Sequence, residues 1–324
     1  MTSKEALELI KNDIKKVEDA LITHLKTDIP LINKVISYIF SSGGKRLRPA
    51  FLILSSKMCG YTGNNDIMLS VVIEYIHTAT LLHDDVIDGA KYRRNKISAN
   101  GKYGNDIAVL CGDFMYSRGY IILTEYGNKE IQKLLSATAM KMSEGEVIQL
   151  IKTADINISM EDYIQIIERK TAVLFSAACE IGGRLSNLDE EKCNLLSNFG
   201  KELGIAFQMS DDILDYLGDP KVTGKNNGTD LNEGKLTLPV ILLLKLANNE
   251  EKSRISDIFI SEDKNNDDLQ FITNLMEKYN IKDKSEEIMI NYINKAIDNL
   301  ETFPNSQYKD ALTSLAKAMV HRQK

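Results

Sequence analysis

The sequence of 324 residues contains no tryptophan and little glycine or proline, with 19 Gly and 5 Pro. Because these two residues end helices and form tight turns, their scarcity disfavours a turn-rich β architecture and favours long helices. The four cysteines occur singly, with no CxxC pair, at Cys59, Cys111, Cys179 and Cys193. This spacing excludes the usual disulfide and zinc frameworks and predicts reduced thiols in the core.

The sequence also lacks an excess of basic charge and any long apolar run. Forty Lys and Arg against 46 Asp and Glu leave a net charge of −6, which gives no electrostatic case for a nucleic-acid partner. The most apolar stretch, 238–244, is ended by Lys245 and falls short of the ~18 uncharged residues of a membrane span. The N-terminal segment carries scattered charges and no apolar signal core. We therefore expect a soluble, cytoplasmic protein without a transmembrane segment.

What the sequence does contain is helical periodicity. In the first 25 residues Ile10, Ile14 and Val17 fall on one stripe. Two pairs are spaced as capping boxes, Thr2 with Glu5 and Ser159 with Asp162. Several later segments are apolar nearly all round, as expected inside a large bundle, and no strand-like alternation stands out. The pattern predicts one all-α domain over 1–324. Its further helices are expected at 29–40, 49–60, 66–88, 105–126, 129–153, 159–186, 189–218, 237–248, 265–279, 281–301 and 305–322.

A DDxxD motif occurs twice, at 84–88 and at 211–215. On a helix the first and last carboxylates of such a motif point the same way. Both motifs end apolar segments, where carboxylates are costly unless a cation compensates them. Helix capping or surface salt bridges are the ordinary alternative for a single acidic cluster. Six carboxylates without His or Cys in the pattern favour Mg²⁺, which takes oxygen ligands and bridges to phosphate oxygens.

Basic residues gather in three polar, glycine-containing segments. GGKRLRP spans 43–49, Arg93 and Arg94 follow the first Asp motif, and GK pairs at 224–225 and 234–235 follow the second. Glycine lets a backbone approach a polyanion closely, and Arg binds phosphate oxygens in a bidentate manner. GGKRLRP lacks the spacing of a nucleotide-binding P-loop. A single Lys or Arg would be interpreted as ordinary surface charge, but together with the two Asp motifs these segments favour binding of a polyanion.

Together these segments resemble the trans-prenyltransferases, the polyprenyl diphosphate synthases. The resemblance is carried along the whole chain by GGKRLRP, HTATLLHDDVIDGAKYRR, ERKTAVLF, FQMSDDILDY and GKNNGTDLNEGKLTLP. Among the family's members the chain most resembles the bacterial octaprenyl type, including the ending TSLAKAMVHRQK. The resemblance implies a helical bundle of the isoprenoid synthase type with a central apolar cavity. It also implies a transferase that adds isopentenyl diphosphate units to an allylic diphosphate, expected to be farnesyl diphosphate.

The resemblance also implies a role for each matching residue. Two to three Mg²⁺ ions would be held by the six motif carboxylates, Asp84, Asp85, Asp88, Asp211, Asp212 and Asp215. The allylic diphosphate would meet Arg93, Lys170, Thr171, Gln208, Lys225 and Lys235. Isopentenyl diphosphate would meet Lys45, Arg48, His77 and Arg94. The catalytic group would be Asp84, Asp85, Asp88, Lys170, Asp211, Asp212 and Lys225.

Two histidines near the first motif are interpreted differently. A lone His on an apolar helix is usually a packed core residue. His77 lies two turns before Asp84, on the same face, and a substrate role is therefore preferred for it. His83 directly precedes the motif, points elsewhere, and is interpreted as structural.

Product length is a steric question, because the growing tail would run from the first Asp motif into the apolar core. Short-chain members carry aromatic residues four or five positions before the first Asp. Here Thr80 and Ala79 occupy those positions, with Ile76 one turn further back. These side chains favour a long product of about eight units, as in the side chain of a respiratory quinone. The floor of the tunnel is expected near 114–116.

Several alternatives stay open at this point. The chain could be a shorter-chain synthase, or the catalytic subunit of a heteromeric one. A class I terpene cyclase also pairs an Asp-rich motif with Mg²⁺, but needs no second diphosphate pocket. A non-catalytic regulatory helical subunit is a fourth reading. We expect a homodimer, with transient membrane contact for product release.

Overall fold

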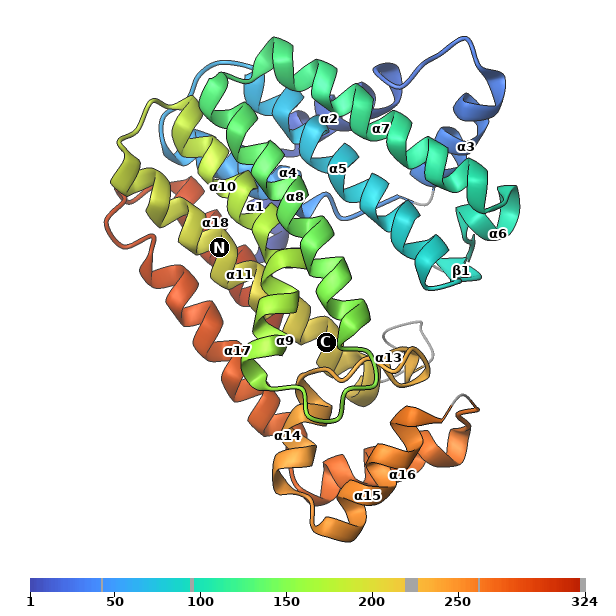
Figure 1. Ribbon diagram of the computed structural model, residues 1–324. Coiled ribbons are helices and arrows are strands. Elements are labelled where there is room, and N and C mark those ends of the chain that lie inside the picture. The colour runs from blue at the N-terminus through green and yellow to red at the C-terminus, as the bar shows by residue number, and fades with distance from the viewer. Residues whose placement is uncertain (42, 94–95, 219–226, 262, 321–324) are drawn as a thin grey trace. The chain divides into compact units, whose positions relative to one another are not determined.

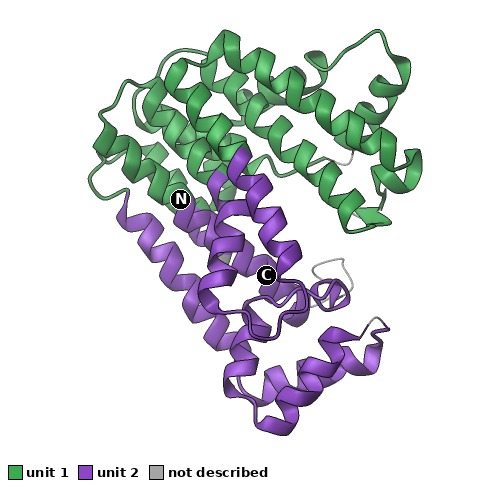
Figure 2. Cartoon of the chain, viewed as in Figure 1, with its two compact units in different colours: residues 1–139, 174–200, 300–315 green, residues 140–173, 201–299, 316–324 purple. Residues whose placement is uncertain are grey.

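The computed structural model describes residues 1–41, 43–93, 96–218, 227–261 and 263–320 (Figure 1). The chain forms two compact units, each assembled from three stretches of sequence (Figure 2). Unit 1 comprises 1–139, 174–200 and 300–315, and unit 2 comprises 140–173, 201–299 and 316–324. Four helices contribute residues to both units: α8 (Lys129–Ile151), α10 (Val173–Leu185), α11 (Glu190–Leu217) and α18 (Gln307–Val320).

Unit 1 is built around one long buried helix, α5. The elements of its first part are α1 (Ser3–Glu8), α2 (Lys11–Thr23), α3 (Pro30–Phe40), α4 (Leu47–Met58), α5 (Asn65–Ile87), β1 (Tyr92–Arg93), β2 (Lys96–Ile97), α6 (Ala99–Tyr103) and α7 (Asn105–Tyr126). Helix α5 packs against α7, α4 and α2, and α5 and α7 lie side by side (Figure 1). Because α5 has neighbours on several sides, its sequence is apolar nearly all round.

The core of unit 1 joins α4 to α10 and α11. The Phe51 ring meets those of Phe175 and Phe199 edge-on, with centroids 5.9 and 6.0 Å apart. Helix α10 approaches α4 so closely that a Cβ on Gly182 would lie 2.6 Å from the Ser56 backbone nitrogen. A glycine is therefore needed at this crossing.

Unit 2 holds the rest of the bundle. Besides its parts of the shared helices it contains α9 (Met160–Ile167), η1 (Glu168–Ala172), α13 (Thr229–Asn232), α14 (Leu238–Leu246), α15 (Asn249–Ile260), α16 (Asn266–Lys278) and α17 (Ile281–Asp298). Helix α14 is the most apolar and packs against α17, α16 and α9. The second Asp motif lies on α11, in this unit.

The all-α prediction is confirmed for the described residues, whose strands form only one two-stranded antiparallel ladder that pairs Arg93 with Lys96. Both predicted capping boxes are present, at Thr2 and at Ser159. None of the helices in the described ranges is long and apolar enough to cross a bilayer. That 1–324 acts as a single domain stays a prediction.

Three local predictions differ from the structure. The helix expected at 159–186 is interrupted by the π turn η1, which the apolar pattern does not reveal. Helix α15 was not predicted, because its sequence is highly charged and only Ile255, Ile258 and Phe259 are buried; an Asn248 capping box starts it. The segment between the helices expected at 66–88 and 105–126, where no element was expected, contains the β ladder and α6.

Candidate active site

The first Asp motif lies at the C-terminal end of α5. Asp84 and Asp85 lie in its last turn, and Asp88 is the C-cap, with its backbone N–H 2.8 Å from the Asp84 carbonyl oxygen. The C-terminal end of a helix carries partial negative charge, so carboxylates are electrostatically unfavourable there. A cation is therefore required to make this arrangement favourable.

Asp85 is the buried member of this motif and is paired with Arg93. The guanidinium Nε of Arg93 donates to both carboxylate oxygens, at 2.7 and 2.9 Å. The β ladder holds Arg93 in place, and Asn100 of α6 donates to the Asp85 backbone carbonyl. The residues predicted to bind metal and diphosphate thus contact each other. The pair gives this motif a guanidinium, which can also bind phosphate oxygens.

A pocket in unit 1 opens beside this pair. Its lining includes His77, Asp85 and Arg93, together with apolar side chains of α3 and α5. The structure thus brings His77 to the same pocket as the first motif. His83 faces α7 instead: its ring stacks on Tyr116, and its Nε2 lies 3.2 Å from the Val109 carbonyl oxygen. This agrees with the structural interpretation of His83.

Arg46 also lines this pocket, and sequence reasoning missed it. Its guanidinium forms a buried ion pair with Glu74, at 2.7 Å, and its backbone is left-handed with φ of 47°. Glu74 could have revealed it, because a carboxylate inside an apolar helix needs a cationic partner. Lys45 and Arg48, which were predicted to bind isopentenyl diphosphate, are not among the residues that line the pocket. Lys45 is exposed, and the Arg48 guanidinium lies over the Phe175 ring, 4.5 Å from its centroid.

The chain-length residues occupy neighbouring positions on α5. Ala79 and Ile76 are buried in the core of unit 1, at 0% and 3% exposure. Thr80 is half-buried, and its hydroxyl donates to the His77 carbonyl oxygen at 2.9 Å. None of the three belongs to the pocket lining. Their effect on product length stays a prediction.

The second Asp motif, on α11 in unit 2, is held differently. Asp212 is buried, and its two oxygens accept hydrogen bonds from the Tyr163 hydroxyl, at 2.6 Å, and the Gln208 amide, at 2.8 Å. Asp215 accepts the backbone N–H groups of Thr229 and Asp230, at 3.2 and 3.0 Å. Its position is therefore tied to the start of α13.

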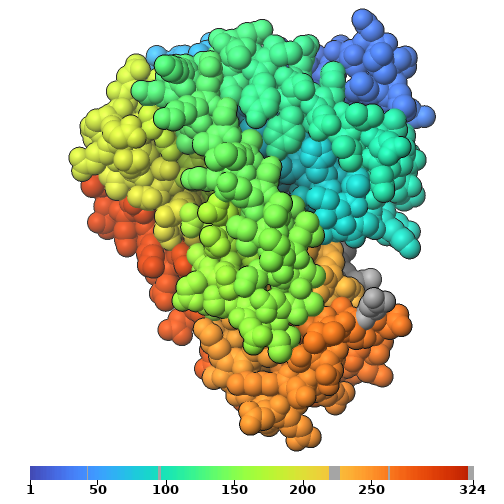
Figure 3. Space-filling model, in the orientation of Figure 1, coloured from blue at the N-terminus to red at the C-terminus, as the bar shows by residue number. Residues whose placement is uncertain are grey.

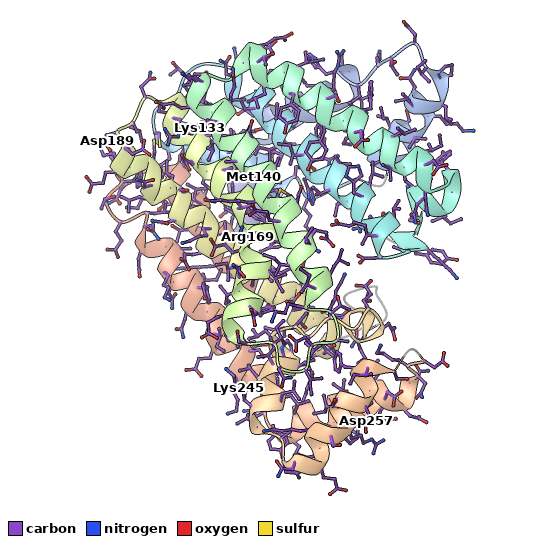
Figure 4. The ribbon with its side chains drawn as sticks, viewed as in Figure 1. Lys133, Met140, Arg169, Asp189, Lys245 and Asp257 are labelled. Atoms are coloured by element: carbon purple, nitrogen blue, oxygen red, sulfur yellow. The ribbon has the colours of Figure 1, made fainter. Side chains whose placement is uncertain are left out.

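The predicted Lys170 and Thr171 lie on the π turn η1. A π turn adds a residue to a helix and often marks a functional site. Lys170 pairs with Glu146 of α8 at 2.5 Å, and Arg169, labelled in Figure 4, pairs with Glu144. The Thr171 hydroxyl donates to Gln208 Oε1 at 2.8 Å. Thr171 thus links the π turn to Asp212 of the second motif through Gln208.

The approach of α8 to the π turn depends on a glycine. A Cβ on Gly145 would lie 2.7 Å from the Arg169 Cβ.

Lys235, the last of the predicted lysines that the structure describes, pairs with Glu233 at 2.7 Å. Lys225 and Arg94 lie outside the described residues.

The surroundings of Asp212 fit a divalent cation. Burial raises the pKa of Asp212 to about 7, and the like charges of Asp211 and Asp215 add to this rise. The hydrogen bonds from Tyr163 and Gln208 oppose it without cancelling it. A cation at the carboxylate would supply the compensating charge. In the described ranges no group of three or more acidic, His or Cys side chains is arranged as a metal site.

The sequence matches the polyprenyl synthetase family over residues 29–276. It is 37% identical to octaprenyl diphosphate synthase of Escherichia coli (strain K12), over 100% of both chains. It is 32% identical to heptaprenyl diphosphate synthase component 2 of Bacillus subtilis (strain 168), over 100% of this chain and 92% of the relative.

A solved structure, the polyprenyl synthase from Caulobacter crescentus CB15 complexed with calcium and isoprenyl diphosphate, matches this chain with a TM-score of 0.95. The sequences are 32% identical, and the match covers 100% of this chain and 98% of that one. The predicted fold of the isoprenoid synthase type is confirmed. The chain therefore belongs to the polyprenyl synthetase family and is a prenyltransferase, a trans-polyprenyl diphosphate synthase.

Proposed function

We propose that this prenyltransferase makes a long all-trans polyprenyl diphosphate of about eight isoprene units, starting from farnesyl diphosphate. The observation that carries the proposed chemistry is that each DDxxD motif has a dedicated set of partners. Arg93 pairs with Asp85, and the Thr171–Gln208 link ends on Asp212. Motifs retained only for helix capping would need neither set.

In the proposed reaction the allylic C–O bond breaks, and its electron pair leaves with the diphosphate. The double bond of isopentenyl diphosphate then attacks the carbocation, a carbon–carbon bond forms, and loss of a proton restores a double bond. Bound Mg²⁺ would stabilise the negative charge that develops on the leaving diphosphate. We assign Asp84, Asp85, Asp88, Asp211, Asp212 and Asp215 to holding two to three such ions.

The chain's own cations have the same electrostatic task. Arg93 would bind phosphate oxygens with its planar guanidinium, and Lys170, Lys225 and Lys235 would add positive charge at the allylic diphosphate. We assign Thr171 and Gln208 to the carbocation, whose positive charge the dipoles of a carbonyl or amide group would stabilise. For isopentenyl diphosphate we assign Lys45, Arg48, His77 and Arg94. The pocket supports this role for His77, which lines it, and not for the other three.

The proposed product length rests on two observations. The residues four and five positions before the first motif, Thr80 and Ala79, are small, and Ala79 is fully buried on α5. The relative named octaprenyl diphosphate synthase matches this chain over its full length. We further propose that the product serves as a quinone side chain, which requires a chain long enough to anchor the quinone in a bilayer.

The assembly is part of the same proposal. We propose a homodimer in the cytoplasm, with all of 1–324 acting as one catalytic domain and with transient membrane contact during product release. Helix α7 lies at the visible surface of unit 1 in Figure 3 and exposes Leu110, Tyr120 and Ile121. Light scattering after size exclusion should give twice the chain mass of 36.4 kDa.

The test is incorporation of labelled isopentenyl diphosphate into farnesyl diphosphate, with and without Mg²⁺, followed by chromatography of the dephosphorylated products. A Mg²⁺-dependent ladder ending near eight units is expected. A ladder that ends at three or four units would keep the chemistry and contradict the length, leaving a farnesyl or geranylgeranyl synthase.

The second candidate is the catalytic subunit of a heteromeric synthase, which the relative named component 2 favours. It predicts no incorporation by the purified chain alone, and recovery when a small partner subunit is added. A cyclase would instead consume a longer allylic diphosphate without isopentenyl diphosphate. A purely regulatory subunit would do neither, and the relatives, which are named as synthases, argue against it.

A further inference from the structure

Tyr163, on α9 in unit 2, is a residue to which no role has been assigned so far. Its side chain is 2% exposed, and its hydroxyl donates to Asp212 Oδ2 at 2.6 Å. The other oxygen, Oδ1, accepts from Gln208 at 2.8 Å. Both oxygens of this buried carboxylate are thus held by neutral donors. A carboxylate with donors on both oxygens has a fixed orientation, and each oxygen keeps a lone pair for another partner.

The hydrogen bonds around Asp212 run in one direction. The Thr171 hydroxyl donates to the Gln208 amide oxygen, which leaves the Gln208 amide nitrogen to donate to Asp212. Tyr163 of α9, which is 49 residues away in sequence, donates to the other oxygen of Asp212. The π turn, α11 and α9 therefore converge on one carboxylate. Removing the Tyr163 hydroxyl would release one oxygen while leaving the Gln208 contact in place.

A purely structural tyrosine hydroxyl looks different in this protein. Tyr75 of α5 is also fully buried, and its hydroxyl donates to the backbone carbonyl of Leu21 at 2.7 Å. That bond joins two helices and touches no ionisable group. The Tyr163 bond has a similar length and burial, but its acceptor is the central carboxylate of a DDxxD motif. The acceptor therefore distinguishes a positioning role from ordinary packing.

We propose that Tyr163 is a positioning residue, which orients the Asp212 carboxylate for the divalent cation that the second motif binds. The inference rests on the proposed function, because it requires that this motif holds Mg²⁺. Groups that hydrogen-bond to a metal ligand fix its orientation, and their loss typically costs about 10- to 100-fold in metal affinity. Tyr163 touches neither substrate in this role and acts through Asp212.

The test is a Mg²⁺ titration of Tyr163→Phe, read out by equilibrium binding. Calorimetry follows the binding of a non-reactive thiolo analogue of farnesyl diphosphate at increasing Mg²⁺. The expected result is a rise of about tenfold in the Mg²⁺ concentration that gives half-maximal binding. Analogue affinity at saturating Mg²⁺ should be recovered. In steady-state assays kcat should likewise approach the wild-type value once Mg²⁺ is saturating.

Tyr75→Phe is the matched control, because it deletes the same group from an equally buried hydrogen bond. It should lower the melting temperature without shifting the Mg²⁺ dependence. Incorporation of 4-aminophenylalanine at 163, which keeps a donor, should restore most of the wild-type Mg²⁺ dependence. If Tyr163 only filled space, Phe and 4-aminophenylalanine at 163 would give the same Mg²⁺ dependence.

An unchanged Mg²⁺ midpoint in folded Tyr163→Phe would overturn the inference. If that variant does not fold, 4-fluorophenylalanine at 163 fills the volume of the hydroxyl without donating and carries the same expectation. Absence of Mg²⁺-dependent analogue binding in the wild-type protein would instead contradict the proposed function. The two failures are therefore distinguished by the wild-type titration.

Discussion

At the end of α5, Asp85 is held by the guanidinium of Arg93, whereas on α11 the neutral donors of Tyr163 and Gln208 hold Asp212. The two motifs share the DDxxD pattern, as DDVID and DDILD, but their charge balance differs. Asp85 has a cation beside it within the protein. At Asp212, burial and like charges dominate and raise its pKa to about 7. The comparison predicts that the proposed Mg²⁺ would supply more of the countercharge at the second motif than at the first.

The largest effect is expected from removing a carboxylate of either motif. Asp84→Ala and Asp211→Ala should each lower kcat by at least about 10²-fold, since each removes a group that would support charge stabilisation at the leaving diphosphate. Steady-state incorporation of labelled isopentenyl diphosphate measures this. Asp257→Ala, at an exposed position on α15 labelled in Figure 4, is the control and should be near wild type. Near-normal turnover in Asp84→Ala would move the metal site away from α5.

A smaller effect is expected from Arg93→Lys, which keeps the charge at the first motif but loses the bidentate geometry. A charge-assisted hydrogen bond contributes about 1.5–3 kcal/mol, so kcat/KM for the allylic substrate should fall by roughly tenfold or more. Lys96 pairs with Arg93 in the β ladder, so Lys96→Arg tests whether any change in the ladder lowers kcat/KM by the same factor. Equal losses in both variants would show that Arg93 acts only through the ladder.

The comparison also predicts stability changes of opposite sign. Asp85→Asn should destabilise the fold by about 1–3 kcal/mol, because Arg93 loses the charge of its partner. Asp212→Asn, with Mg²⁺ chelated, should be neutral or stabilising near pH 7, because it removes a buried charge and keeps an oxygen for Tyr163. Thermal melts of the two variants and the wild type measure both effects.

The pH dependence of the same melts sharpens this prediction. Because the folded pKa of Asp212 is raised from 3.8 to about 7, the folded state retains a proton that the unfolded chain releases in this range. Wild-type stability should therefore fall as pH rises from 3.8 to about 7, relative to Asp212→Asn. A difference between the two proteins that is the same at pH 4 and pH 7 would contradict this assignment.

The smallest effect on rate is expected from a substitution at Ala79, five residues before the first motif. Its expected effect is on product length. Ala79 precedes Asp84 by the same spacing as Ala206 precedes Asp211, and both alanines are fully buried. Ala79→Tyr should shorten the product while the first condensation stays within a few-fold of wild type. Ala206→Tyr should share only the overpacking cost of about 1–3 kcal/mol. Chromatography of the products distinguishes them, and a product of unchanged length from Ala79→Tyr would place the tail elsewhere.

Much of the fold could be predicted because helix formation depends on near neighbours. The 3.6-residue periodicity located most helices, and the capping residues Thr2 and Ser159 are confirmed. The π turn at Lys170 could not be predicted, since an added residue in one turn depends on what packs against it, here Gly145 of α8. Arg46 and Tyr163 were missed for a related reason, because their partners lie 28 and 49 residues away.

The sequence by itself determined the helical class, the positions of both DDxxD motifs and the family, since these follow from periodicity and from motifs local in the chain. Only the tertiary structure decided which group meets which carboxylate: Arg93 at Asp85, Tyr163 at Asp212 and Lys170 at Glu146. The physical reason is that ion pairs and hydrogen bonds act over about 3 Å. Which side chains come that close is set by how helices pack, and helix packing brings together residues that no sequence spacing relates.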